Sequence, residues 1–374
     1  MLTDIQSAIR DTVRAFAQEN IRPLSAQFEA QGGYPTELFG QMAELGLWGM
    51  TAPETFGGAA ADAVSYALAL MEIAAADGAL STIVSIQNSI LVSGLLKDGS
   101  EAQRARFLPD LIGGRTIGAF ALTEADAGSD ASAVRTRATK VEGGWRITGA
   151  KQFITSGKIA GLVMIVAVTD PDAGKKGLSA FIVPTDRPGY AVDKVEHKMG
   201  QAASDTCALR FDDMFVEDDL LIGEAGQGYR IALANLETGR IGIAAQCVGM
   251  AQAALEIAVD YAKDRRSFGK PIMEHQAVGF RLADLATRLE AARQLVLHAA
   301  RTRDAGAPCL TEASMAKLFA SEAAETIVSG ALQTLGGYGY LEEYGIAKIY
   351  RDVRVCQIYE GTSDIQRMVI ARSL

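Results

Sequence analysis

The spacing of apolar residues changes twice along the chain, and this order limits the fold more than any other feature of the sequence. Up to about residue 116, apolar residues recur at helical spacing, as Ile5, Ile9 and Val13 do. From about Ile117, short runs rich in β-branched and aromatic residues are separated by Gly, Pro and Asp clusters, which is typical of strands. Helical spacing returns after residue 222. The sequence therefore predicts an α+β multidomain fold, with an N-terminal all-α domain (1–116), a middle antiparallel β-barrel or small sandwich (117–222) and a C-terminal helical bundle (223–374).

The composition argues against several classes of protein. A chain of 374 residues is too long for one ordinary core, and a net charge of −9 offers no field for nucleic-acid phosphates. The four cysteines and three histidines are not spaced for a zinc site or a CxxC motif, so we expect no metal and a reducing compartment. In the sequence alone, no apolar run approaches the length of a membrane span, so we expect no membrane insertion and a cytoplasmic protein.

One carboxylate near the C-terminus stands out by its neighbours. Glu360 lies between an aromatic residue, Tyr359, and a glycine, Gly361, which lets the backbone bend sharply. Ser363 and Gln366 have the spacing of a capping box, which predicts a helix starting directly after the carboxylate. A lone Tyr-Glu-Gly is most often a solvated loop, so the segment needs support from the rest of the chain.

Four further motifs have the same ambiguity when each is taken alone. Residues 122–130 form a small-residue loop after a strand, and residues 151–157 form a strand that ends in an aromatic ring and two hydroxyls. Residues 264–269 are compatible with a charged helix end, and residues 333–337 with a helix C-cap. Their order and spacing are more specific than any one of them. Together with residues 358–367, they closely resemble the acyl-CoA dehydrogenases over essentially the whole chain.

The resemblance implies a four-helix bundle in the C-terminal domain, a homotetramer, and FAD as cofactor. In that family, the loop after the strand meets the flavin and its pyrophosphate, an aromatic segment lies against the flavin ring, and two further segments reach the FAD of a neighbouring subunit. The positions that match cofactor contacts are Phe120, Leu122, Thr123, Gly128, Ser129, Phe153, Thr155 and Thr362, and, for the neighbouring subunit, Arg265, Ser267, Phe268, Gln333 and Gly337, with Gly336 counted beside them.

The resemblance also implies the reaction. Glu360 would abstract the α proton of a short-chain, possibly branched, acyl-CoA, and flavin N5 would accept the β hydride to leave the trans-2-enoyl-CoA. Electrons would pass to electron transfer flavoprotein. The matching substrate-binding positions are Ser129, Glu237, Arg240, Gln246, Cys356, Tyr359 and Gly361. Among these, Gln246 and Cys356 match residues at the floor of the acyl pocket in short-chain members, although ordinary helix packing explains them equally well.

The chain departs from the family pattern at several positions. The loop reads Ala125-Asp126 where the family usually has Pro-Gly or Ala-Gly, Phe153 replaces a common Trp, and Ala202 replaces a frequent Arg. Some members carry the base at the position of Gly239, which glycine cannot supply.

Three other functions stay open at this point. A non-redox relative such as a sulfinopropionyl-CoA desulfinase lacks a carboxylate at both base positions, so Glu360 argues against it. An acyl-CoA oxidase is excluded poorly by sequence. A non-catalytic flavin-bound scaffold is disfavoured because every expected site position is filled.

Overall fold

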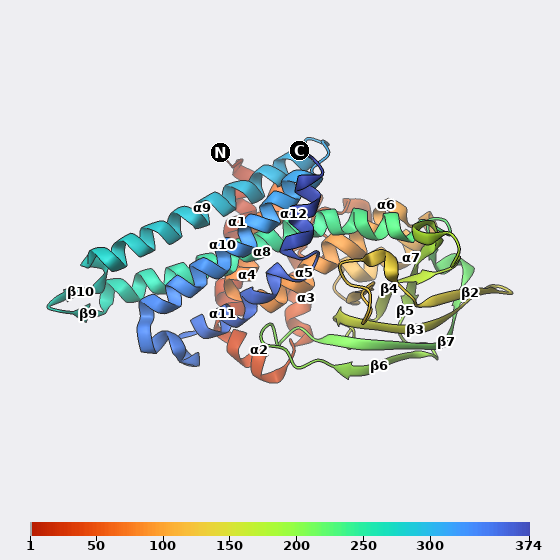
Figure 1. Cartoon of the computed structure of the whole chain (residues 1–374), viewed down its shortest axis with the longest axis horizontal. Helices are drawn as coiled ribbons and strands as arrows, with labels where there is room; N and C mark the ends of the chain where they lie inside the picture. Colours follow the sequence, from red (N-terminus) through yellow and green to blue (C-terminus); the bar gives the residue numbers. More distant parts are fainter. Residues whose placement is uncertain (1) are drawn as a thin grey trace.

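A computed structural model describes residues 2–374 and arranges them as a helical body with a β-sheet domain at one end (Figure 1). Helices form the first and last parts of the chain and strands the middle part, which confirms the order predicted from the spacing of apolar residues. The change of element type falls after α7 and again after β8. We propose that the chain consists of three domains with the bounds expected from the sequence, 1–116, 117–222 and 223–374.

The N-terminal region is all helical. Thr3 and Gln6 form a capping box at its start, as the sequence predicts. A π-helical segment at Gln87–Val92 joins the fifth and sixth helices into one continuous stretch. The helices are α1 (Asp4–Phe16), α2 (Ser25–Gln31), α3 (Thr36–Glu44), α4 (Ala63–Ala76), α5 (Gly78–Ile86), α6 (Ser93–Asp98) and α7 (Glu101–Ile112).

The middle region forms one sheet in the order β6-β7-β3-β2-β4-β5-β8, with β1 paired to β4. Most pairs are antiparallel, but β1 and β2 both run parallel to β4, so the expected antiparallel domain contains two parallel pairings. The strands are β1 (Gly118–Ala121), β2 (Arg137–Val141), β3 (Gly144–Thr155), β4 (Leu162–Val168), β5 (Leu178–Pro184), β6 (Tyr190–Val195), β7 (Thr206–Glu217) and β8 (Leu221–Ile222).

One detail of the sheet differs from the sequence analysis. Gly149 and Ala150 were expected to make a turn between two strands, but they lie inside the single strand β3. The pairing of β3 with β7 shifts register between Ile147 and Gly149. The glycine therefore marks an irregularity within a strand, because a residue without Cβ can approach Thr136 closely there.

Three long helices make up most of the C-terminal region: α8 (Gly228–Asp264), α9 (Gln276–Asp304) and α10 (Leu310–Leu335). A hairpin of β9 (Arg266–Ser267) and β10 (Lys270–Pro271) joins the first two, and α11 (Ile346–Val353) and α12 (Ser363–Ala371) pack on α10. Helix α4 packs on both α8 and α9, so the two helical regions share one continuous hydrophobic core. Helix α8 also contacts the sheet through β4 and β5, and thus runs from the hairpin to the β domain (Figure 1).

Two helical stretches are long and apolar enough to cross a membrane, contrary to the sequence analysis. They are Gly78–Asp98 and α8. However, 89% and 83% of their most apolar windows are buried inside the protein, so the hydrophobic core accounts for their apolar character.

Candidate active site

Glu360 lies on a strained turn just before α12. Its φ of +52° is left-handed, and Gly361 follows with φ +88°. A left-handed conformation is unfavourable for glutamate and persists only where surrounding contacts hold it. Here the Nε2 of Gln366 donates to the carbonyl oxygens of Glu360 (3.3 Å) and Gly361 (2.9 Å). The turn is therefore held from the helix that follows it.

The cap of this helix is not the predicted one. Thr362 is the N-cap residue, and its Oγ1 accepts from the backbone N–H of Ile365 at 3.3 Å. Ser363 is already the first helical residue, and its buried hydroxyl has no partner within residues 2–374. The predicted capping box of Ser363 and Gln366 is therefore wrong, and Gln366 instead donates back to the turn. The hydroxyl of Thr362, predicted as a flavin contact, serves as a cap.

The Glu360 side chain packs directly against Gly239 of α8. A Cβ atom at Gly239 would overlap with Glu360 Oε2. That oxygen is enclosed and has no hydrogen-bond partner within the described chain. The glycine that cannot itself be a base is thus what leaves room for the carboxylate.

Two buried cations flank this carboxylate. Arg240 of α8 is 6% exposed and Lys317 of α10 is fully buried. Arg240 Nη1 donates to Ser314 Oγ at 3.0 Å, and Lys317 Nζ donates to Gly361 O at 2.7 Å. Burial raises the pKa of Glu360 to about 7, against the opposing effects of Lys317 and then Arg240. A carboxyl group with a pKa near the working pH suits general-base chemistry.

A cavity of about 190 Å³ opens in front of Glu360, between the β domain and the helical body. The lining combines apolar side chains with a few hydroxyls, the carboxylate and one cation, which is typical of a small-molecule site. Its lining includes the predicted base and half of the positions predicted to contact cofactor or substrate. These are Phe120, Leu122, Thr123, Gly128, Ser129, Phe153, Thr155, Arg240, Tyr359, Glu360 and Gly361.

The wall on the β-domain side presents an exposed aromatic ring. Phe153 has φ +59° and is 63% exposed. It lies where β3 carries one residue more than its partner β7, between Lys151 and Ile154. Bulges of this kind redirect side chains and are common beside active sites.

This wall fits the flavin expected from the sequence. An open aromatic face, the hydroxyls of Thr123 and Thr155, and the space above Gly128 suit a planar ring with polar edges.

A buried ion pair supports the same wall from behind. Lys151 Nζ donates to Glu124 Oε1 at 2.8 Å and to Leu122 O at 2.9 Å. Glu124 also accepts from the backbone N–H groups of Arg135 and Thr136. These bonds join the start of the predicted cofactor loop to β3 and to the segment before β2.

The floor of the cavity differs from the prediction. Thr82 and Tyr359 line it, whereas Gln246 and Cys356 are fully buried behind them and do not line the cavity. Gln246 Nε2 donates to Thr82 Oγ1 (2.6 Å), and Tyr359 donates to Gln246 Oε1 (2.5 Å). The glutamine therefore acts through the two residues in front of it, because its amide holds both hydroxyls.

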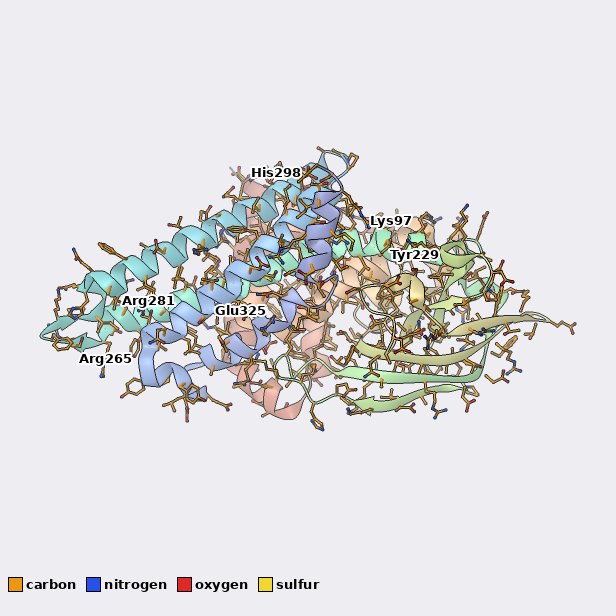
Figure 2. All side chains as sticks on the ribbon, in the orientation of Figure 1. Lys97, Tyr229, Arg265, Arg281, His298 and Glu325 are labelled. Atoms are coloured by element: carbon orange, nitrogen blue, oxygen red, sulfur yellow. The ribbon has the colours of Figure 1, made fainter. Side chains whose placement is uncertain are left out.

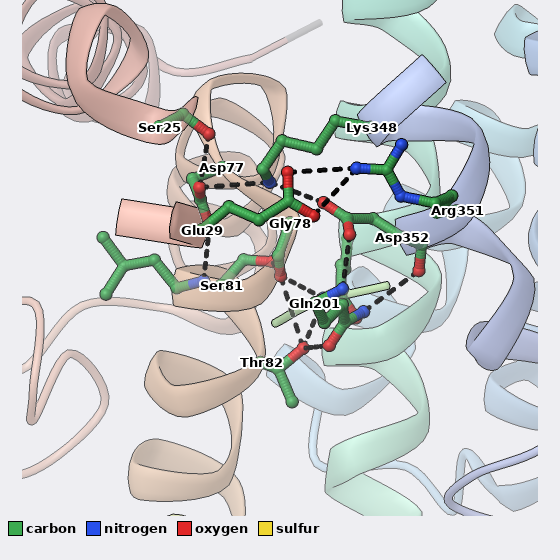
Figure 3. Close-up of polar contacts among 12 residues, drawn as sticks. Ser25, Glu29, Asp77, Gly78, Ser81, Thr82, Gln201, Lys348, Arg351 and Asp352 are labelled. Atoms are coloured by element: carbon green, nitrogen blue, oxygen red, sulfur yellow. Dashed lines mark hydrogen bonds and ion pairs between the residues drawn. The ribbon is translucent and has the colours of Figure 1, made fainter. Parts of the chain in front are cut away.

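A buried polar network extends from this floor. Gln201, from the loop between β6 and β7, accepts from Thr82 Oγ1 at 2.8 Å and donates to Tyr359 and to Asp352 O. Asp352 then pairs with Lys348, which also reaches Asp77 (Figure 3). Gln201 thus connects the N-terminal helices, the β domain and the segment carrying Glu360.

Glu237 does not line the cavity, although it was predicted to contact substrate. Its Oε1 accepts from Cys309 Sγ at 3.4 Å. It stands three residues before Arg240 on α8, whereas the α8 residues that do line the cavity are Leu233, Leu236 and Arg240.

The remaining predicted cofactor residues gather at the opposite end of α8, in a region we call the tip: residues 265–271 and 333–337. Helix α8 separates Arg240 from Arg265 by 25 residues, or about 38 Å at 1.5 Å per residue. Figure 2 shows Arg265 at the far end of the helical body. Arg265, Gly336 and Gly337 line one open hollow of about 390 Å³. Ser267 and Phe268 lie in the hairpin, and Gln333 is exposed in the last turn of α10.

Sequence reasoning missed three residues of the site: Lys317 beside the carboxylate, and Thr82 and Gln201 beside Tyr359. A signal for Lys317 was present, since Ser314, Lys317 and Ser321 recur at helical spacing beside the alanines on the buried side of α10. Thr82 and Gln201 carried no local signal.

Comparisons with known proteins agree with this architecture. Three family models match: the acyl-CoA dehydrogenase N-terminal domain at residues 3–115, the middle domain at 119–214 and the C-terminal domain at 226–374. An acyl-CoA dehydrogenase of Bacillus subtilis (strain 168) is 47% identical over 373 residues, covering 100% of this chain and 98% of the relative.

Two solved structures are also similar over the full chain. The butyryl-CoA dehydrogenase of Megasphaera elsdenii superposes with a TM-score of 0.97 at 40% identity, covering 100% of this chain and 98% of the other. A chain in the structure of the electron transferring flavoprotein of Acidaminococcus fermentans superposes with a TM-score of 0.98 at 39% identity, with the same coverage.

Proposed function

The chain belongs to the acyl-CoA dehydrogenase family of FAD-dependent oxidoreductases, and we propose that it dehydrogenates a short-chain acyl-CoA to the trans-2-enoyl-CoA. The observation that carries this proposal is the Glu360 carboxylate. It is enclosed between Gly239 and two buried cations, it has a pKa raised by burial to about 7, and it faces a small cavity. An oxidation at Cα–Cβ needs a base of this kind for the α proton.

Glu360 is the proposed catalytic base. Its carboxylate takes the α proton and becomes a neutral carboxylic acid, the form that an enclosed site favours. Because Oε2 makes no hydrogen bond within residues 2–374, it is free to accept that proton. Arg240 lines the same cavity, and its positive charge stabilises negative charge that develops on the substrate during proton removal.

The cofactor half of the site is formed by the β-domain wall. Thr123, Ser129, Phe153 and Thr155 are the residues proposed to hold FAD in this chain. When bound, FAD supplies the acceptor for the hydride that leaves Cβ. The residues of the tip are proposed to contact the FAD of a neighbouring subunit in a homotetramer. Electron transfer flavoprotein is the proposed acceptor of the electrons, and the cytoplasm the proposed location.

The closed floor of the cavity supports a short acyl group. Tyr359 and Thr82 close it, and Gln246 holds both hydroxyls from behind. Each methylene that fits contributes about 0.8 kcal/mol of binding, whereas one that does not fit must displace this bonded floor. We propose an optimum of about C4 to C5, on the same reasoning.

The test is a panel of straight and branched acyl-CoAs from about C3 to about C12 with ferrocenium as acceptor. Dehydrogenation that is fastest with butyryl-CoA or a branched C5 thioester supports the proposal. Preference for octanoyl-CoA would contradict the short-chain assignment. Activity that depends on oxygen in place of ferrocenium would indicate an acyl-CoA oxidase, and release of a sulfinate without flavin reduction would indicate the desulfinase class.

A further inference from the structure

We propose that Lys317 is a positioning residue for Glu360: it fixes the turn that carries the carboxylate and supplies the main buried positive charge that faces it. This inference rests on the proposed function, because it takes Glu360 to be the base. Lys317 does not line the cavity, so it acts on the reaction through Glu360 and not by touching substrate.

The position of Lys317 on α10 is the first support. Its side chain is fully buried, and Nζ donates to the carbonyl oxygen of Gly361 at 2.7 Å. The same oxygen accepts from Gln366 Nε2 at 2.9 Å. Glu360 and Gly361 are two consecutive left-handed residues, and such a turn needs external contacts to keep its shape. Lys317 holds it from α10, and Gln366 holds it from α12.

Charge is the second support. A buried ammonium group is costly unless an opposite charge lies nearby. Burial lowers the pKa of Lys317, and the groups that act against burial are the thiols of Cys247 and Cys356 and then the Glu360 carboxylate, while Arg240 acts as a like charge. Among these groups, Glu360 is the carboxylate. Glu360 in turn faces Lys317 and Arg240. The buried hydroxyl of Tyr66 on α4 also faces it: burial raises the pKa of Tyr66, and the negative charge of Glu360 raises it further.

The arrangement of the two cations is the third support. Ser314 holds Arg240 and lies one turn before Lys317 on the same helix. One face of α10 therefore carries Lys317 and, through Ser314, also holds the side chain of Arg240 from α8. Of the two, Lys317 has the larger effect in lowering the pKa of Glu360 from the value that burial alone would give.

A purely structural role for Lys317 would predict lower stability without a change in the titration of the base. The experiment therefore compares variants that separate hydrogen bond from charge. Lys317→Met removes both, Lys317→Gln keeps a donor but loses the charge, and Lys317→Arg keeps both in a different shape. Each is purified as the FAD-loaded enzyme, and its flavin content and thermal midpoint are measured first.

The decisive measurement is the pH profile of kcat/KM for butyryl-CoA between about pH 5.5 and about pH 9. We expect the acidic limb of Lys317→Met and Lys317→Gln to move up by about one pH unit, which lowers activity about fivefold at pH 7 and about tenfold on the acidic side of the limb. Lys317→Arg should keep the limb of the wild type. An unchanged limb in Lys317→Gln, with lower stability alone, would overturn the proposal.

A readout without turnover covers the case in which the variants are poorly active. Thermal midpoints at about pH 8.5, where Glu360 is ionised, are compared in a double-mutant cycle of Lys317→Gln and Glu360→Gln. We expect the decrease in thermal midpoint caused by Lys317→Gln to become smaller, or to change sign, in the Glu360→Gln background. In that background the Lys317 ammonium group no longer has its counter-charge. Additive effects would overturn the proposal. Wild-type protein with no dehydrogenase activity but a coupled cycle would contradict the proposed function and leave the Lys317–Glu360 interaction standing.

Discussion

The cavity around Glu360 and the tip at Phe268 share an unusual backbone conformation, but the surroundings of that backbone differ between the two regions. Both place a non-glycine residue at positive φ, +52° for Glu360 and +50° for Phe268. The turn at Glu360 is held by bonds from Gln366 and Lys317. Phe268 sits at the apex of a two-residue hairpin turn with Gly269, and its ring is 96% exposed.

The difference indicates that the two regions are completed in different ways. The cavity holds its carboxylate, its cations and its aromatic wall within one chain. Positive φ at Phe268 and Gly269 is what such a hairpin turn requires, and the Phe268 ring packs edge-on against His275, with 6.0 Å between the centroids. Because the ring nevertheless stays almost fully exposed, we propose that the tip contacts something outside the chain. The separation of about 38 Å along α8 means that the tip does not complete the cavity of its own chain. The following predictions test this division, from the largest expected effect to the smallest.

Glu360→Gln should abolish dehydrogenation while leaving yellow, FAD-loaded protein. A general base contributes on the order of 10²–10⁴-fold, and the amide cannot accept the proton. Steady-state activity with butyryl-CoA and the flavin spectrum are the measurements. Residual activity above about a tenth of wild type would show that another group is the base.

Gly239→Ala should lower kcat on the order of 10²-fold, because the new methyl group overlaps with Glu360 Oε2 and displaces the carboxylate. Oligomeric state and flavin content should not change, since the tip is untouched. Gly33→Ala is a matched control, because a Cβ there meets nothing within 4 Å. A fully active Gly239→Ala enzyme would mean that the carboxylate is placed differently in the working enzyme.

Arg265→Ala should weaken FAD binding about tenfold and the oligomer with it, although the residue lies far from the cavity. A charge-assisted hydrogen bond contributes about 1.5–3 kcal/mol, and a ligand that binds only the assembled state stabilises assembly. Size-exclusion chromatography with a flavin absorbance trace measures both. Arg281→Ala on α9, at the same end of the body, is the control. An unchanged oligomer with full flavin content would remove the tip from the proposed cofactor site.

The pH dependence of activity and of stability should be set by Glu360 in the cavity and not by residues of the tip. The pKa of Glu360 is raised by burial from 4.5 to about 7, so activity should fall about tenfold per pH unit below that value. The raised pKa also means that the folded state binds this proton more tightly than the unfolded state does. Its contribution to stability is fully present below pH 4.5 and is lost as pH rises through about 7. Thermal midpoints of wild type and Glu360→Gln across this range isolate the effect, and parallel curves would contradict it.

Gln246→Ala should produce the smallest change, a shift of the optimum toward longer acyl chains by a few carbons, with a few-fold effect on each thioester. The reason is indirect. Without the Gln246 amide, Thr82 and Tyr359 lose their shared hydrogen-bond partner and can move apart. The floor then opens to methylenes of the acyl chain, which contribute about 0.8 kcal/mol of binding each. The ratio of hexanoyl-CoA to butyryl-CoA activity measures it. The same ratio in mutant and wild type would show that the floor stays closed without the amide.

The sequence-based hypotheses were most reliable where local pattern and chemistry coincide. The helix, strand, helix order follows from the spacing of apolar residues, and the structure confirms it. The carboxylate was singled out from its own segment together with the order of the other motifs, and the structure encloses it, whereas a lone Tyr-Glu-Gly is most often a solvated loop. The errors concern neighbouring residues with similar propensities. Thr362 and Ser363 can both cap a helix, and only the backbone path selects Thr362.

The contacts that set the chemistry at the site lie beyond the reach of local pattern. Nothing in the residues around Lys317, Thr82 or Gln201 shows that they meet Gly361 or Tyr359, since these contacts join segments far apart in the chain. Likewise, Gln246 was predicted to form the pocket floor, but the structure places it behind Thr82 and Tyr359, and this position depends on how α8 packs against α5.

By itself, the sequence determined which segments are helices or strands, and it supplied the carboxylate, the glycines and the aromatic rings, because these depend on residue type and short-range spacing. Only the tertiary structure decided which cations surround Glu360, which hydroxyls close the cavity, and that the tip lies at the other end of α8. The reason is physical: the ionisation of a buried carboxyl and the depth of a cavity depend on charges and side chains brought within a few ångströms by folding.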